Sequence, residues 1–122
     1  MKDWTKITGL EANRIAEEQH IARTGTFNGI VLKWTSGSEA PFFVKITGSL
    51  RCLSCSRSIP FEIDGMSGEA SCDGCGVTYK LFRERCDLDG TVAIILVASV
   101  YSRPTGVTAS PPVIDVTDVQ PC

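Results

Sequence analysis

The stretch on which the fold depends is residues 51–80, RCLSCSRSIPFEIDGMSGEASCDGCGVTYK. It holds two C-x-x-C pairs, Cys52 with Cys55 and Cys72 with Cys75, and sixteen residues separate the pairs. Two such pairs at this separation are a strong signal for a site that binds one metal ion through four cysteines. The segments on either side are therefore considered in relation to this site.

The spacing within each pair suits a tetrahedral metal site. Zinc in a structural site takes four ligands, and four thiolates complete its coordination without water or substrate. Two cysteines separated by two residues reach the same ion when the backbone between them makes a tight turn that aims N–H groups at the sulfurs. Gly74 and Gly76 favour such a turn in the second pair, because glycine tolerates unusual backbone angles. The first pair has Ser54 and Ser56 instead, so its turn is less clearly indicated.

The segment between the pairs has the pattern of two strands joined by a turn. Apolar residues alternate at Ile59, Phe61 and Ile63, which indicates a strand, and Asp64-Gly65 favours a turn. Residues 50–80, about a quarter to a third of the chain, therefore resemble the zinc-ribbon family. The resemblance implies a structural Zn²⁺ held by the four cysteines, and it allows a role in transcription or translation.

Two disulfides, or a redox C-x-x-C, are the alternatives to a metal. Disulfide-rich secreted domains use cysteines more densely than this chain, which has six in 122 residues. A redox pair usually opens a helix in a thioredoxin-like pattern, and neither pair does so. The sequence shows no signal peptide, so we expect a cytoplasmic protein. The longest apolar run, residues 92–100, falls far short of the ~20 residues of a membrane-spanning helix, so no membrane partner is expected.

The chain on either side of the cysteines predicts a mainly β fold with one N-terminal helix, in the α+β class. Thr8 and Glu11 fit a capping box, and the helix that they open would extend to about Arg23 within an N-terminal segment of residues 1–25. A small antiparallel β domain follows over residues 26–102, with the zinc ribbon inserted at residues 50–80. Its other strands are expected at residues 27–34, 42–47, 77–86 and 91–102.

Residues 91–102 are the most strand-like run in the chain. They are rich in β-branched residues and carry no charge. A strand without polar alternation is typical of burial on both faces, so this strand is expected at the centre of the sheet.

Residues 103–122 predict an extended C-terminal arm. Prolines at 104, 111, 112 and 121 block a helix and remove donors from any sheet. Val113, Ile114 and Val116 are candidates for contact with the sheet edge or groove of a neighbouring subunit. Cys122 is either an idle thiol or the source of an intermolecular disulfide that the arm delivers.

Aromatic residues gather near the loop that joins the first two expected strands. Trp34 and Phe42 are interpreted either as core residues or as anchors for a partner, because tryptophan and phenylalanine are enriched at interface centres. Both remain candidate partner-binding residues.

The sequence favours a protein that is not an enzyme. A zinc site made of four cysteines has no open position for substrate, and the chain has no phosphate-binding loop, nucleophile elbow or H-E-x-x-H motif. Protein–protein assembly is the leading hypothesis, with other subunits or further copies of the chain as partners. A virus particle is one such setting, suggested by size and by the arm rather than by a motif. Nucleic-acid binding through Lys80, Arg83 and Arg85 is the alternative, although the net charge of −2 does not favour it.

Overall fold

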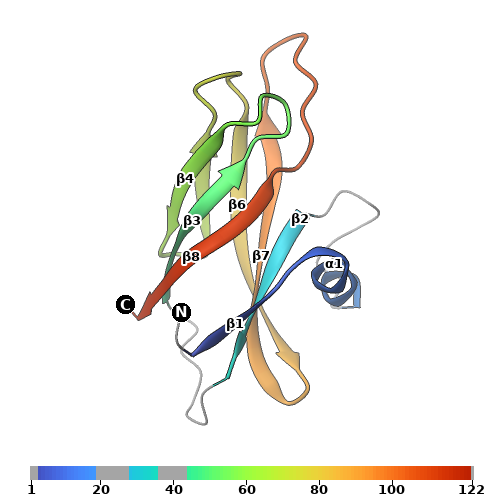
Figure 1. The fold of residues 1–122 in the computed structure, drawn as a ribbon, viewed down its shortest axis with the longest axis vertical. Helices are drawn as coiled ribbons and strands as arrows, with labels where there is room; N and C mark the ends of the chain where they lie inside the picture. The colour runs from blue at the N-terminus through green and yellow to red at the C-terminus, as the bar shows by residue number, and fades with distance from the viewer. Residues whose placement is uncertain (1–2, 19–27, 36–43, 122) are drawn as a thin grey trace.

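A computed structural model describes residues 3–18, 28–35 and 44–121 (Figure 1). It confirms a mainly β fold with one N-terminal helix and two antiparallel sheets, of five and three strands. The elements are β1 (Trp4–Ile7), α1 (Gly9–Glu18), β2 (Asn28–Trp34), β3 (Val44–Arg51), β4 (Ser58–Ile63), β5 (Ser67–Ser71), β6 (Thr78–Leu88), β7 (Thr91–Ser102) and β8 (Val113–Pro121).

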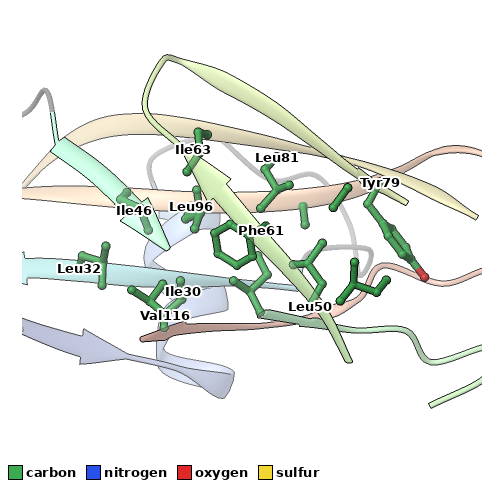
Figure 2. Packing of buried hydrophobic residues seen from close by; sticks show 14 of the residues in the cluster. Ile30, Leu32, Ile46, Leu50, Phe61, Ile63, Tyr79, Leu81, Leu96 and Val116 are labelled. Atoms are coloured by element: carbon green, nitrogen blue, oxygen red, sulfur yellow. The ribbon is translucent and has the colours of Figure 1, made fainter. Parts of the chain in front are cut away.

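The two sheets pack face to face and enclose the main core. The larger sheet has the order β1-β2-β7-β6-β5 and the smaller one β4-β3-β8. Figure 2 shows side chains from both sheets meeting in this layer, among them Phe61 of β4 and Leu96 of β7. Burial of these alternating apolar residues is the main favourable contribution to holding the sheets together.

The helix covers part of the outer face of the five-stranded sheet, so the fold has three layers. Ala12, Ile15 and Ala16 of α1 are buried in a second apolar cluster that includes Val31 of β2 and Ile95 of β7. Strand β7 is therefore buried on both faces where the helix lies, as the sequence predicted for residues 91–102, and it is central in its sheet. The expected extension of the helix to Arg23 lies outside the described residues.

The zinc ribbon expected as an insertion at residues 50–80 is not separate from the β domain, because its strands belong to the two sheets of the sandwich. Strand β4 pairs with β3, and β5 pairs with β6, so the two strands between the cysteine pairs belong to different sheets. The physical reason is that β4 has one wholly apolar face, and this face is buried against the opposite sheet. The segment thus supplies edge strands to both layers of the sandwich.

The C-terminal residues also differ from the predicted arm outside the β domain. Residues 113–121 form β8, which pairs with β3 of the same chain. Alternation places Ile114 and Val116 in the core, because these residues share the face that meets the larger sheet. Gly48 permits the close approach of β8, since a Cβ atom there would collide with the backbone of Asp115. The sequence also missed β1, which pairs with β2.

Candidate metal centre

The two cysteine pairs lie in the loops of two β-hairpins. Cys52 and Cys55 lie between β3 and β4, where Arg51 pairs with Ser58. Cys72 and Cys75 occupy the matching loop between β5 and β6. Both loops lie at the same end of the sandwich, beside the connection from β7 to β8 (Figure 1). Each sheet therefore contributes one pair of cysteines to a common site.

The four sulfur atoms are close enough to share one ion. All of them lie within 4.8 Å of one another, with Cys52 Sγ 3.5 Å from Cys75 Sγ and Cys55 Sγ 3.3 Å from Cys72 Sγ. Four sulfurs at about 2.3 Å from a tetrahedral ion are about 3.8 Å apart, so the set fits such an ion with small adjustments. Both of these distances exceed the ~2.05 Å of a disulfide, and these four cysteines are free thiols. The residues present are thus arranged to hold a metal.

The backbone of the first loop forms a knuckle, the tight turn that brings both cysteines of a pair toward one ion. The N–H of Ser56 donates to the carbonyl of Cys52 at 2.7 Å, and the N–H of Cys52 donates to the carbonyl of Arg57 at 2.9 Å. Ser56 adopts a left-handed conformation, with φ of 63°. A residue with a side chain incurs a steric penalty in this region, which explains why the sequence indicated this turn less clearly.

The second knuckle repeats the first. Gly76 donates to the carbonyl of Cys72 at 2.9 Å, and Cys72 donates to the carbonyl of Val77 at 2.8 Å. Gly76 occupies the position equivalent to Ser56 and has φ of 77°. Here the sequence supplies the residue that this conformation favours.

Hydrogen bonds to the sulfurs favour ionisation of the first cysteine in each knuckle. Burial opposes ionisation of Cys52, but the Tyr79 hydroxyl and the backbone N–H groups of Cys55 and Ser54 outweigh it and lower the pKa to about 6. Burial likewise opposes ionisation of Cys72, and backbone N–H groups of its own knuckle, with the side chain of Cys55, lower its pKa.

The second cysteine of each knuckle behaves in the opposite way. The N–H of Val77 lowers the pKa of Cys75, but burial and the neighbouring cysteines raise it by more, to about 12. The N–H of Arg57 similarly favours ionisation of Cys55, and the neighbouring Cys72 side chain reverses this and raises the pKa. In each knuckle the first cysteine is thus ionised more readily than the second. A divalent cation would displace the remaining protons.

Tyr79 links the second knuckle to the first. It lies two residues beyond Val77 on β6, is fully buried, and its hydroxyl donates to Cys52 Sγ at 3.0 Å. Burial and the hydrogen bond to Cys52 raise the pKa of Tyr79, so the phenol stays protonated as a donor. The sequence analysis did not identify this residue as part of the site. The available signal was its inward alternation with Leu81 on the same strand.

The connection between β7 and β8 contacts both knuckles. The hydroxyl of Ser54 donates to the carbonyl of Thr108 at 2.8 Å. A Cβ atom on Gly76 would lie 2.9 Å from Cγ of Pro104, so this proline sits directly against the second knuckle. Val107 and Ala109 are half-buried against the main core. The β7–β8 connection is thus a third segment that borders the site, beside the two knuckles, and the cysteine spacing did not indicate it.

A charged side chain from one knuckle lies across the other. A Cβ atom on Gly74 would be 2.5 Å from Nε of Arg57 and 3.3 Å from Sγ of Cys55. A side chain at position 74 would therefore force the Arg57 side chain to move from this place. The guanidinium brings a positive charge close to the thiolates, and this charge opposes the net negative charge of a metal bound by four of them.

The other predicted site residues are not gathered in one place. Ile114 and Val116, expected to contact a partner, are buried in the chain's own core, because they face the opposite sheet. Val113 remains 41% exposed. Trp34 is half-buried and packs edge-on against Trp4, with ring centroids 5.0 Å apart. Phe42 and Cys122 lie outside the described residues.

The three basic residues of β6 do not form a patch. Arg83 is 1% exposed and donates to the carbonyl of Ile63 at 3.1 Å, inside the sandwich. Lys80 lies on the opposite face of the strand, because side chains alternate along it. Because Arg83 is buried, it is not available to contact nucleic acid as the hypothesis of binding through these three residues requires.

Comparison with known proteins gives no family for this chain: no family model, curated protein or solved structure matches it. Its function must therefore be inferred from the site itself. Within the described ranges, no helix has the length and apolar character needed to cross a membrane.

Proposed function

We propose that this chain is a non-enzymatic zinc protein that acts by binding other protein subunits, and that its Zn²⁺ is structural. The observation that carries the proposal is the origin of the four ligands. One pair comes from a hairpin of the three-stranded sheet and the other from a hairpin of the five-stranded sheet. An ion bound to all four joins the two layers of the sandwich at one end.

The donor set favours zinc in a closed site. Four thiolates in a tetrahedron suit Zn²⁺ and leave no position for a substrate or an activated water. Cys52 and Cys72 are fully buried, and Cys55 and Cys75 are half-buried beside the β7–β8 connection. When bound, the ion would supply stability rather than reactivity, since the two hairpins would no longer separate freely.

Binding to protein rather than to nucleic acid is favoured by the exposed surface. The basic residues of β6 point to opposite faces, whereas Phe82 and Tyr101 are exposed at 39% and 59% on one face of the larger sheet. Aromatic side chains are enriched at the centres of protein interfaces. We therefore propose an assembly role, and nucleic-acid binding is not proposed.

Metal analysis of the purified chain tests the structural part of the proposal. Native mass spectrometry should show one zinc per chain, retained in the presence of a reductant. Cys72→Ser should lose the zinc, whereas Cys86→Ser should keep it, because Cys86 is buried beneath α1 and outside the cluster. A wild-type chain that carries two disulfides and no zinc would refute the proposal.

A further inference from the structure

As far as the structure describes it, helix α1 packs on only part of the outer face of the five-stranded sheet. α1 has ten residues and is about 15 Å long. Strands β6 and β7 have eleven and twelve residues, which corresponds to about 36–40 Å. The helix packs over the end of this face that includes Cys86, Ala93 and Ile95. The same strands continue beyond it toward the metal centre (Figure 1).

Exposed side chains gather on the part of this face beyond the helix. Phe82 and Tyr101 are 39% and 59% exposed, and Nζ of Lys80 lies 4.3 Å from the centroid of the Tyr101 ring. Lys80 also lies 4.0 Å from a carboxylate oxygen of Glu69 on the neighbouring strand. Strand pairing places these residues beside one another on β5, β6 and β7. We name this surface the outer patch: Glu69, Lys80, Phe82, Val97, Ser99 and Tyr101.

We propose that the outer patch binds a second copy of this chain, face to face about a two-fold axis. This inference rests on the proposed assembly function and names its partner. A two-fold contact sets the same surface against itself, so the surface must carry groups that complement one another. The outer patch carries such groups. Glu69 on edge strand β5 and Lys80 on the neighbouring strand β6 have opposite charges. Phe82 and Tyr101 supply apolar area.

Pairing through the edges of the three-stranded sheet is less favourable than this face-to-face contact. Edge strand β4 carries an exposed proline, Pro60, which cannot donate to an added strand. Edge strand β8 has a register irregularity opposite Thr47 and Gly48 and an exposed Asp115. Proline, bulges and charges are features with which proteins prevent edge-to-edge association.

The size of the patch predicts a reversible contact. Three strands about 4.8 Å apart, over about six residues at ~3.3 Å each, give a plan area of roughly 300 Å² per chain. Specific interfaces of standard size bury about 800 Å² of accessible surface per partner. The outer patch is smaller than this standard, so the dimer should dissociate on dilution.

Sedimentation velocity of the zinc-loaded chain over a series of concentrations tests the inference. Wild type should shift from monomer toward dimer as concentration rises. Phe82→Ser and Tyr101→Ser should each raise the dissociation constant about tenfold or more, as truncation of an aromatic interface residue does. Leu10→Ser is the matched control, because Leu10 is 88% exposed on α1 and outside the patch, and it should leave association unchanged.

Charge reversal identifies the partner as a second copy. Glu69→Lys and Lys80→Glu should each weaken self-association, because the two-fold contact then faces like charges. An equal mixture of the two variants should associate more strongly than either alone, since every facing pair regains opposite charges.

Three outcomes would overturn the inference: a wild-type chain that stays monomeric at every concentration, aromatic variants that dimerise like wild type, or a mixture that associates no better than its components. A monomeric chain with one tightly bound zinc would refute the dimer and leave the structural metal site standing. A chain that dimerises through the outer patch but takes up no zinc would support the dimer and refute the metal site.

Discussion

The hydroxyl of Tyr79 donates a hydrogen bond of 3.0 Å to Sγ of Cys52, and so connects the strand after the second knuckle to a ligand of the first. Both groups are fully buried. A donor aimed at a thiolate stabilises its negative charge and fixes its position before the metal arrives. This contact is one of the places where the two halves of the site meet away from the ion.

Tyr79→Phe should therefore weaken metal binding while leaving the fold intact. Loss of a hydrogen bond to a metal ligand typically costs 10–100-fold in affinity, and we expect a decrease of about tenfold. Competition with a chromophoric chelator measures this change, and circular dichroism checks that the sheets persist. A variant with wild-type affinity would show that the hydroxyl contributes only to packing.

Ser56→Gly should stabilise the zinc-loaded protein. Ser56 has φ of 63°, and a left-handed conformation costs a residue with a side chain about 1–2 kcal/mol. Glycine removes this penalty but loses more backbone entropy on folding, so we expect a net gain of about 0.5–1 kcal/mol in the free energy of unfolding. Urea denaturation measures it.

The reverse substitution at the equivalent position of the second knuckle should have the opposite effect on stability. Gly76→Ser introduces a side chain at φ of 77° and directs it at Pro104, so it should destabilise the protein by more than about 1 kcal/mol. If both substitutions change stability in the same direction, the equivalence of the two positions is wrong.

Sequence pattern was sufficient for the fold class, the central strand and the gathering of the four cysteines in one place. Alternation and uninterrupted apolar runs depend on local residues, as in β7, and the cysteine spacing encodes a local turn. Pairings between strands that are distant in the sequence were not predicted. The position of β8, for example, depends on burial of Ile114 and Val116 against the other sheet and on the absence of a side chain at Gly48. Tyr79 was missed for a related reason: its partner Cys52 lies on another hairpin.

Metal affinity should rise with pH. The raised pKa values of Cys55 and Cys75 mean that these thiols are protonated near neutral pH, so binding of a divalent ion to all four thiolates must release at least two protons. Below the pKa of Cys52, which is about 6, this thiol also becomes protonated and the number of released protons should increase. Calorimetry in buffers of different ionisation enthalpy counts these protons. Metal binding without proton release at neutral pH would contradict the proposed charge distribution.

The stability of the metal-free chain should also depend on the ionisation of Cys52. Its pKa falls from 9.0 to about 6 on folding, so its ionisation contributes stability that is fully present above pH 9.0 and is lost as the pH falls to about 6. Cys52→Ser should flatten this part of the stability profile. Denaturation of the metal-free wild type and variant at several pH values between these limits provides the comparison.

Removal of the metal should loosen β8 before it loosens the central strands. The β7–β8 connection contacts both knuckles, through Thr108 and Pro104, so separation of the knuckles removes its support. Strand β8 follows this connection and pairs only with β3 in its sheet, among the strands that the structure describes, whereas β7 has a partner on each side and the helix above it. Local opening is easiest where a segment has few buried contacts.

Hydrogen exchange with and without a chelator measures this difference. Amides of residues 113–119 should exchange faster after the metal is removed, and those of residues 93–97 should change least, because they pair on both sides at the centre of the larger sheet. Ser54→Ala offers a metal-loaded comparison, since it removes the bond to Thr108 and retains all four ligands. It should speed exchange in the connection with little loss of zinc. Uniform acceleration over the whole chain would mean that the metal supports the sandwich as a single unit and that the connection has no separate dependence on it.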